Sequence, residues 1–374
     1  MAVTIENEPE DWQTSDNPII YQFSSDEAGE TNFSFKVEFK MGGQIVYTDK
    51  VFVEVADNAH FDASQVTRFL TPTPNVNTGL TSEAGITSTI QLVVTENYGS
   101  PPQDEASASS FVTNVFKGSV SDRDYLELEY GDFELTKWFT DHPTNEIDIL
   151  RNETKTLSML GAGNLATATM NFYDSDDVLL HTYTTPTQNY DIWQININAS
   201  LLTFVVGVPD PAAVAYFTVQ INSSEVLTLR YYDDACFAPV SVRWVNRYGA
   251  YDSFVFKHVN IESGTIDASN YESQFGGWYN GSYSFRLEES GVIDYFKRNN
   301  GKGRAVTDYL TQDIQNWLTS IFSGLRHQMT LEDGTTYPVR ITSRNYQKEQ
   351  SRFTDLRALE IKYDVANMDN SLTL

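Results

Sequence analysis

Cysteine is almost missing from this chain, and Cys236 is the only one. A single thiol excludes an intrachain disulfide and any zinc site built from several cysteines. Such cysteine usage is typical of proteins that fold in a reducing cytoplasm. Because Cys236 stands next to Phe237, we interpret it as a small buried apolar residue and not as a nucleophile.

Basic residues are scarce: 25 Lys and Arg face 51 Asp and Glu, for a net charge of −26. Residues 1–130 carry −15, residues 131–290 carry −12 and residues 291–374 carry +1. A surface that grips nucleic acid needs clustered Lys and Arg to neutralise phosphates, so the composition disfavours that function. The acidity favours solubility, and it also suits the wall of a conduit along which DNA slides without sticking.

Long hydrophobic runs are missing too. No window approaches the eighteen or more apolar residues of a membrane-spanning helix, so we expect no membrane partner. The first residues, MAVTIENEPEDWQ, are acidic where a signal peptide would be basic and then apolar. We therefore expect synthesis and folding in a cytosol, whatever the final location.

Motifs of known catalytic chemistry are absent, including HExxH, GxSxG and the Walker A pattern. No two histidines share metal-ligand spacing; they are His60, His142, His181, His258 and His327. With 51 carboxylates in the chain, no particular pair points to glycoside hydrolysis, which depends on a separation in space. The sequence thus predicts no catalytic residues, no metal and no cofactor, and we expect a protein that is not an enzyme.

Three short clusters have plainer interpretations. The Asp174–Asp177 segment lacks the central Gly and distal Glu of a calcium loop, and a turn is expected. The basic, glycine-rich segment 301–304 is expected to be a solvated loop before a helix rather than a phosphate site. The aromatic pairs Tyr231-Tyr232 and Trp278-Tyr279 suit a sugar platform, although aromatics at strand spacing usually belong to a core or an interface.

Aromatic residues are plentiful, with 22 Phe, 21 Tyr and 6 Trp. Together with frequent Thr they favour strands over helices. Alternation is clearest from Phe33 to Lys40, where odd positions are apolar and even positions are polar, as in a sheet with one buried face. The sequence therefore predicts a mainly β protein.

The length and the turn signals indicate three domains. The first (1–120) is a β-sheet or sandwich with short helices expected near 62–70 and 109–117. The second (121–235) is a β-sandwich of short strands. Its strands are expected at YLELEY, LATATMNFY, VLLHTYTT, YDIWQININ, AVAYFTVQIN and SEVLTLRYY.

The third domain (236–374) combines strands with the best helix of the chain. It opens with a hairpin, residues 240–259, that turns at Arg247–Ala250. The helix is expected over 311–323, with Thr311 as its cap and Gly324 as its end. Its apolar positions recur at helical spacing, at Ile314, Trp317, Leu318, Ile321 and Phe322.

The hairpin sequence NRYGAYDSF, from Asn246 to Phe254, resembles sequences in virion proteins of tailed phages that infect Bacteroidetes, including crAss-like phages. Two further parts are similar to the same proteins: the N-terminal sheet that begins at Asn17-Pro18-Ile19-Ile20-Tyr21, and the run from Leu310 to Ala366. Together they cover about half of the chain. The middle domain matches least well.

This resemblance implies a structural protein of the tail, neck or baseplate, with a tail-tube-like C-terminal β domain. It implies a homo-oligomeric ring, six- or twelve-fold, around the DNA path, with other virion proteins as partners and viral DNA only as passing cargo. Sheet edges would be covered by neighbouring subunits. The residues expected at a subunit interface are Arg247, Tyr248, Tyr251, Trp278 and Tyr279. The alternative is a receptor- or glycan-binding protein at the tail tip.

Overall fold

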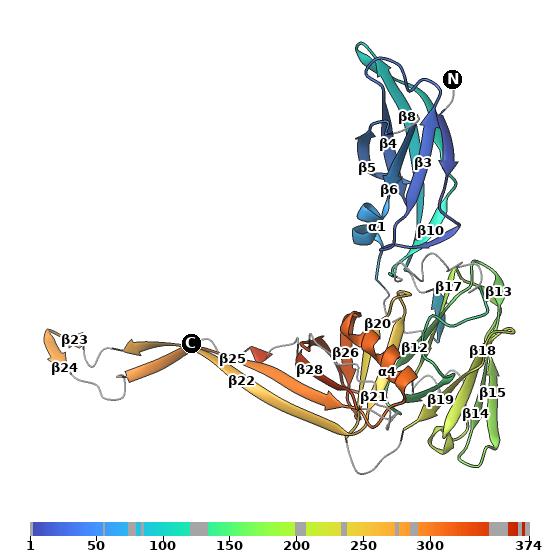
Figure 1. The fold of residues 1–374 in the computed structure, drawn as a ribbon. Coiled ribbons are helices and arrows are strands. Elements are labelled where there is room, and N and C mark those ends of the chain that lie inside the picture. The colour runs from blue at the N-terminus through green and yellow to red at the C-terminus, as the bar shows by residue number, and fades with distance from the viewer. Residues whose placement is uncertain are drawn as a thin grey trace. The chain divides into compact units, whose positions relative to one another are not determined.

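The computed structural model describes residues 3–54, 57–73, 80–83, 86–119, 134–198, 207–232, 238–273, 277–284, 291–343, 358–365 and 369–370. They form two compact units. Unit 1 contains residues 1–148, 154–231 and 245–252, and unit 2 contains 149–153, 232–244 and 253–374. The fold is mainly β, as the composition predicts (Figure 1).

The N-terminal part of unit 1 is built from two sheets whose apolar faces form one core. Phe23 of one sheet meets Phe35 of the other edge to face, with ring centroids 4.9 Å apart. The alternation predicted for 33–40 is confirmed, because Phe35, Val37 and Phe39 are fully buried. One sheet is β1 (Val3–Asn7), β3 (Ile20–Ser25) and β6 (Asn58–Asp62); the other is β2 (Trp12–Thr14), β10 (Thr113–Phe116), β8 (Thr87–Gly99), β4 (Ser34–Met41) and β5 (Gln44–Val51), with β9 (Pro102–Ser109) paired to β8. All the strand pairs of these two sheets are antiparallel except β2 with β10, which is parallel.

The first short helix is present as α1 (Ser64–Leu70). Asp62 stands two residues before it and accepts hydrogen bonds from the Ser64 backbone N–H (2.9 Å) and hydroxyl (2.9 Å). The second expected helix, at 109–117, is wrong. Ser110 is bonded to Leu92 of β8, because its hydroxyl accepts from the Leu92 N–H (2.9 Å) and its own N–H donates to the Leu92 carbonyl (2.8 Å), and strand β10 begins three residues later.

The middle part of unit 1 forms a second group of sheets, as the strand pattern predicts; the expected strand YLELEY lies outside the described residues. A β7–β17 pair joins residue Glu83 to Trp193 and so links the N-terminal and middle parts. The two first predicted domains therefore belong to one compact unit. The strands are β7 (Thr81–Glu83), β11 (Glu146–Ile149), β12 (Lys155–Leu160), β13 (Leu165–Ala166), β14 (Ala168–Tyr173), β15 (Leu179–Thr184), β16 (Gln188–Asn189), β17 (Ile192–Ile197), β18 (Tyr216–Ile221) and β19 (Leu227–Tyr231), with a 3-10 turn η3 (Pro211–Ala213).

Unit 2 is organised around an eight-stranded sheet in the order β21-β20-β26-β27-β28-β25-β22, with β29 also paired to β25. Its core gathers Trp244, Trp317 and Tyr363 with smaller apolar residues. The strands are β20 (Val240–Val245), β21 (Tyr251–Phe256), β22 (Val259–Ser273), β25 (Gly291–Val306), β26 (Leu325–Thr330), β27 (Thr336–Ile341), β28 (Glu360–Val365) and β29 (Asp369–Asn370), and a separate small hairpin is β23 (Gly277–Tyr279) with β24 (Ser282–Ser284).

The C-terminal helix is confirmed as α4 (Gln312–Leu318), continued by a 3-10 turn η5 (Thr319–Phe322). The Thr311 hydroxyl accepts from the Ile314 N–H at 3.5 Å, at the expected cap. Trp317, Leu318 and Ile321 are buried against the sheet. The helical spacing of these apolar residues thus marks the face that closes the core of unit 2.

Candidate functional site

The Arg247 turn is closed by the side chain of the residue before it. Asn246 Oδ1 accepts hydrogen bonds from the backbone N–H groups of Tyr248 (3.0 Å) and Ala250 (3.1 Å). Gly249 then adopts φ = +70°, a conformation that glycine takes without steric cost. The predicted hairpin is confirmed, and an Asn four residues before Ala250 explains why it is so tightly held.

Arg247 and Tyr248 converge on one carboxylate. Arg247 Nη2 donates to Asp141 Oδ1 at 2.7 Å, and the Tyr248 hydroxyl donates to the same oxygen at 2.7 Å. Arg247 Nη2 also lies 3.0 Å from the Tyr248 oxygen. Burial and the neighbouring Asp141 charge raise the pKa of Tyr248, so its hydroxyl stays a proton donor.

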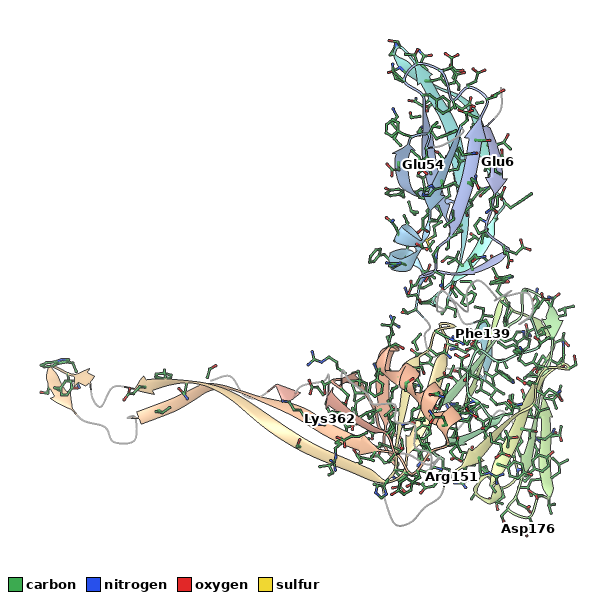
Figure 2. The ribbon with its side chains drawn as sticks, in the orientation of Figure 1. Glu6, Glu54, Phe139, Arg151, Asp176 and Lys362 are labelled. Atoms are coloured by element: carbon green, nitrogen blue, oxygen red, sulfur yellow. The ribbon has the colours of Figure 1, made fainter. Side chains whose placement is uncertain are left out.

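Tyr248 is enclosed by aromatic rings of unit 1. Its ring stacks on Phe139, labelled in Figure 2, with centroids 6.0 Å apart, and Phe139 stacks on Phe116 at 5.4 Å. Tyr248 is 4% exposed and Tyr251 is 8% exposed. Two of the expected interface residues are thus internal packing residues of unit 1, and Arg247 is half-buried in its ion pair with Asp141. A contact of this turn with another subunit stays a prediction.

The turn also packs closely against the backbone that leaves β10. The Ser119 N–H donates to the Arg247 carbonyl at 2.8 Å, and Gly249 lies against the Lys117 carbonyl. Lys117 itself is buried, and its ammonium donates to Asp16 (2.8 Å) and to the Arg68 carbonyl (2.8 Å). Asp141 and Lys117 lie far from the hairpin in sequence and carry no motif, so no sequence signal identifies them as its partners.

Asp252, at the start of β21, is a buried carboxyl beside this turn. Burial raises its pKa above the usual 3.8, while hydrogen bonds from Thr140 and Asn246 oppose the shift. A folded-state pKa above the unfolded one means that the folded protein binds more protons at pH values just above 3.8. The stability supplied by the neutral form is therefore complete below that pH and is lost as pH rises through the folded pKa.

We expect Asp252→Asn to remove this loss. Urea unfolding of both proteins across a pH series should show a free energy of unfolding that falls with rising pH in the wild type and is flatter in the variant. Asp176→Asn, at an exposed turn residue, serves as the control and should keep the wild-type profile. Parallel profiles for wild type and Asp252→Asn would contradict the assignment.

The longest strands of the chain, β22 and β25, form an extended antiparallel pair (Figure 1). Its register runs from Val259↔Val306 to Ser273↔Gly291. At about 3.3 Å per residue, a strand of this length spans roughly 50 Å. Among the described residues, β28 and β29 pair with β25 only at 302–306 and at 298–299. The outer half of the pair, residues 268–273 with 291–297, extends past these described partners and is called the arm below.

Beyond the arm lies the small hairpin β23–β24, which carries two of the expected interface residues. It turns at Asn280-Gly281, with φ of +49° and +81°, the sequence signature of a tight hairpin turn. Trp278 is 75% exposed and Tyr283, opposite it in register, is 47% exposed. The two rings meet edge to face with centroids 5.8 Å apart. Tyr279 follows Trp278 on β23.

The glycine-rich segment 301–304 belongs to the interior of β25, and the expectation of a solvated loop is wrong. Gly303 pairs with Glu262 on one side and Tyr363 on the other. The Tyr363 ring lies across Gly303, and its hydroxyl donates to Asn260 Oδ1 at 2.9 Å. The glycine is needed because a β-carbon at position 303 would occupy the space of that ring.

The remaining clusters offer less chemistry. Asp174 accepts from the N–H groups of Asp176 and Val178, both at 2.9 Å, which is the expected turn. Within the described residues no group of three His, Cys, Asp or Glu side chains is placed to hold a metal. Cys236 lies outside those residues. No helix among them is both long and apolar enough to cross a membrane.

Comparisons with known proteins give little. No family model matches the chain, and no curated protein matches it. Among solved structures, the chain is similar to one from the complex of Dpr2 Ig1-Ig2 with DIP-Theta Ig1-Ig3, at 9% identity and a TM-score of 0.22 over 82% of this chain and 95% of that one. A TM-score of this size carries no argument about fold or function.

Proposed function

We propose that this chain is a structural subunit of a tailed-phage virion, in the tail, neck or baseplate, and that it assembles into a ring around the DNA path. The observation that carries the proposal is the arm, the outer half of the long β22–β25 pair. A pair of strands this long stabilises little core of its own and leaves backbone edges that need covering. In a ring those edges are covered by neighbouring copies through head-to-tail contacts.

The small hairpin β23–β24, called the tip hairpin below, supports the same function. The exposed rings of Trp278 and Tyr283 leave apolar area in contact with water in an isolated subunit, which is unfavourable. Trp and Tyr are also enriched at the centre of protein interfaces. The strongly acidic composition fits a wall past which DNA moves without binding. The partners proposed are further copies of the chain and other virion proteins.

The test is the oligomeric state of wild type and Trp278→Ala by native mass spectrometry and sedimentation. We expect a closed ring for the wild type, alone or with virion partners, and loss of the ring in the variant with an unchanged circular dichroism spectrum. Tyr309→Ala is the matched control in the same unit, since Tyr309 is also 75% exposed but lies outside the arm and tip. A wild type that stays monomeric at high concentration and with virion partners would overturn the proposal.

One observation favours a second function, receptor or glycan binding at the tail tip. The Trp278 and Tyr283 rings form an exposed aromatic pair at a tight turn, and sugar rings stack on such surfaces. This function predicts a glycan-array signal that Trp278→Ala abolishes and Tyr309→Ala retains, with no change in the oligomeric state of either variant.

A further inference from the structure

A groove lies in the N-terminal part of unit 1, between β5, β6 and α1. It encloses about 560 Å³, within the range of ligand-sized cavities. Tyr47 and Phe61 line it with stacked rings whose centroids are 6.0 Å apart. Phe69 and Leu70 line it from α1, and they are 81% and 47% exposed. Two large apolar side chains are thus presented to solvent beside a preformed hollow.

Strand β5 borders this groove and is the end strand of its sheet. Among the described strands it pairs only with β4, so the backbone groups of its other edge have no strand partner. Every residue from Gln44 to Lys50 is exposed. A register shift at Val46 places an extra residue in the strand, and Val46 and Tyr47 both line the groove. An open edge beside an apolar hollow is the geometry that accepts an added strand.

The charges around the groove indicate the chemistry of that strand. Its lining includes the carboxylates of Asp49 and Asp62 and no Lys or Arg. The Asp62 carboxylate is bonded to the start of α1. Asp49 is exposed, and among the described residues it accepts from two neighbours on β5, the Tyr47 hydroxyl (3.0 Å) and the Lys50 N–H (2.7 Å). His60 faces Glu54, labelled in Figure 2, at 3.0 Å. A basic side chain complements this rim.

We infer that the groove and the β5 edge bind an extended segment of a partner protein that carries apolar and basic residues two positions apart, because Tyr47, Asp49 and Val51 lie on the same face of β5 and side chains two apart on the added strand share that face. The added strand pairs with the β5 backbone, its apolar side chains enter the groove against Phe69, and a Lys or Arg meets Asp49. The −15 charge of residues 1–130 disfavours the same surface of a second copy as the occupant, because two such regions repel each other. This inference is independent of the arm and of the virion function.

The probe is a labelled synthetic peptide that repeats Val-Thr-Lys-Thr, so that Val and Lys share one face of the added strand, and it is titrated against the full chain by fluorescence anisotropy. Phe69→Ser should weaken binding about tenfold or more, as expected when a large apolar contact is lost. Phe111→Ser is the matched control, because Phe111 is 80% exposed in the same unit but lies outside the groove. The Phe111→Ser variant should bind the peptide with the same affinity as the wild type. Asp49→Asn should also weaken binding, whereas Glu105→Gln, at another exposed acid, should not.

Two further peptides test the mode of binding. A peptide that repeats Val-Thr-Glu-Thr should bind at least about tenfold more weakly than the Val-Thr-Lys-Thr peptide. N-methylation of alternate residues, in both registers, should abolish binding in one of them because it removes the backbone donors of the added strand. Equal losses in Phe69→Ser and Phe111→Ser, or equal affinity of every peptide, would overturn the inference. So would a concentration-dependent dimer, seen without peptide, that Phe69→Ser abolishes.

Discussion

Gly249→Ala is expected to unfold unit 1, with a loss of more than about 4 kcal/mol in the free energy of unfolding. A methyl group at this position would overlap the carbonyl oxygen and carbon of Lys117. That carbonyl belongs to the backbone that leaves β10, and the Ser119 N–H two residues on is bonded to Arg247. Relieving the overlap would therefore separate the turn from the segment it packs against.

A matched variant separates overlap from backbone conformation. Gly43 has φ = +77°, close to the +70° of Gly249, and a β-carbon there would meet nothing within 4 Å. Gly43→Ala should cost only about 1 kcal/mol, the price of a left-handed residue. Urea denaturation followed by tryptophan fluorescence compares the two variants. Equal losses would show that φ alone, and not the contact with Lys117, makes Gly249 necessary.

The comparison of sequence and structure shows where local patterns suffice. The period-2 run of Phe35, Val37 and Phe39 predicts a half-buried strand because burial on one face needs only the strand's own alternation. The α4 pattern succeeds for the same reason: its apolar positions lie on one face of a single element. In both cases the information is contained in a few adjacent residues.

Local patterns fail where a distant residue decides the structure. The apolar residues of this segment fit one face of a helix, yet the structure separates them. Phe111 and Val112 are 80% and 53% exposed, whereas Val115 and Phe116 are fully buried in strand β10. The bond of Ser110 to Leu92 supplies the competing sheet contact. Such a contact joins residues 18 apart and leaves no mark on the helical pattern.

The candidate site divides in the same way. The Asn246–Ala250 turn is visible in the sequence because turn residues act on their own backbone. Its partner Asp141 lies 106 residues from Arg247 and is one of 51 acidic residues, so the ion pair has no sequence signature. The groove has no sequence signature for another reason: apolar residues on a short helix predict burial, whereas Phe69 and Leu70 are 81% and 47% exposed.

Gly303→Ala is the second large effect, at about 3 kcal/mol, and it acts on the base of the arm. The β-carbon would overlap the Tyr363 ring, which is 1% exposed in the core of unit 2. The ring has little room to move because its hydroxyl bonds Asn260 on β22. The variant must either expel Tyr363 from the core or separate β25 from its neighbours.

Gly301→Ala is the control on the same strand, since its β-carbon would lie 3.1 Å from a Val365 methyl group, a tight contact but no overlap, and the substitution should cost about 1 kcal/mol. Hydrogen exchange locates the effect: β22, β25 and β28 should lose protection in Gly303→Ala while β4 and β8 of unit 1 keep theirs. Uniform loss of protection in both units would contradict a local effect. If the arm also carries assembly, Gly303→Ala should reduce ring formation under conditions where the variant remains folded, because a displaced β25 no longer presents the edge that a neighbouring copy covers.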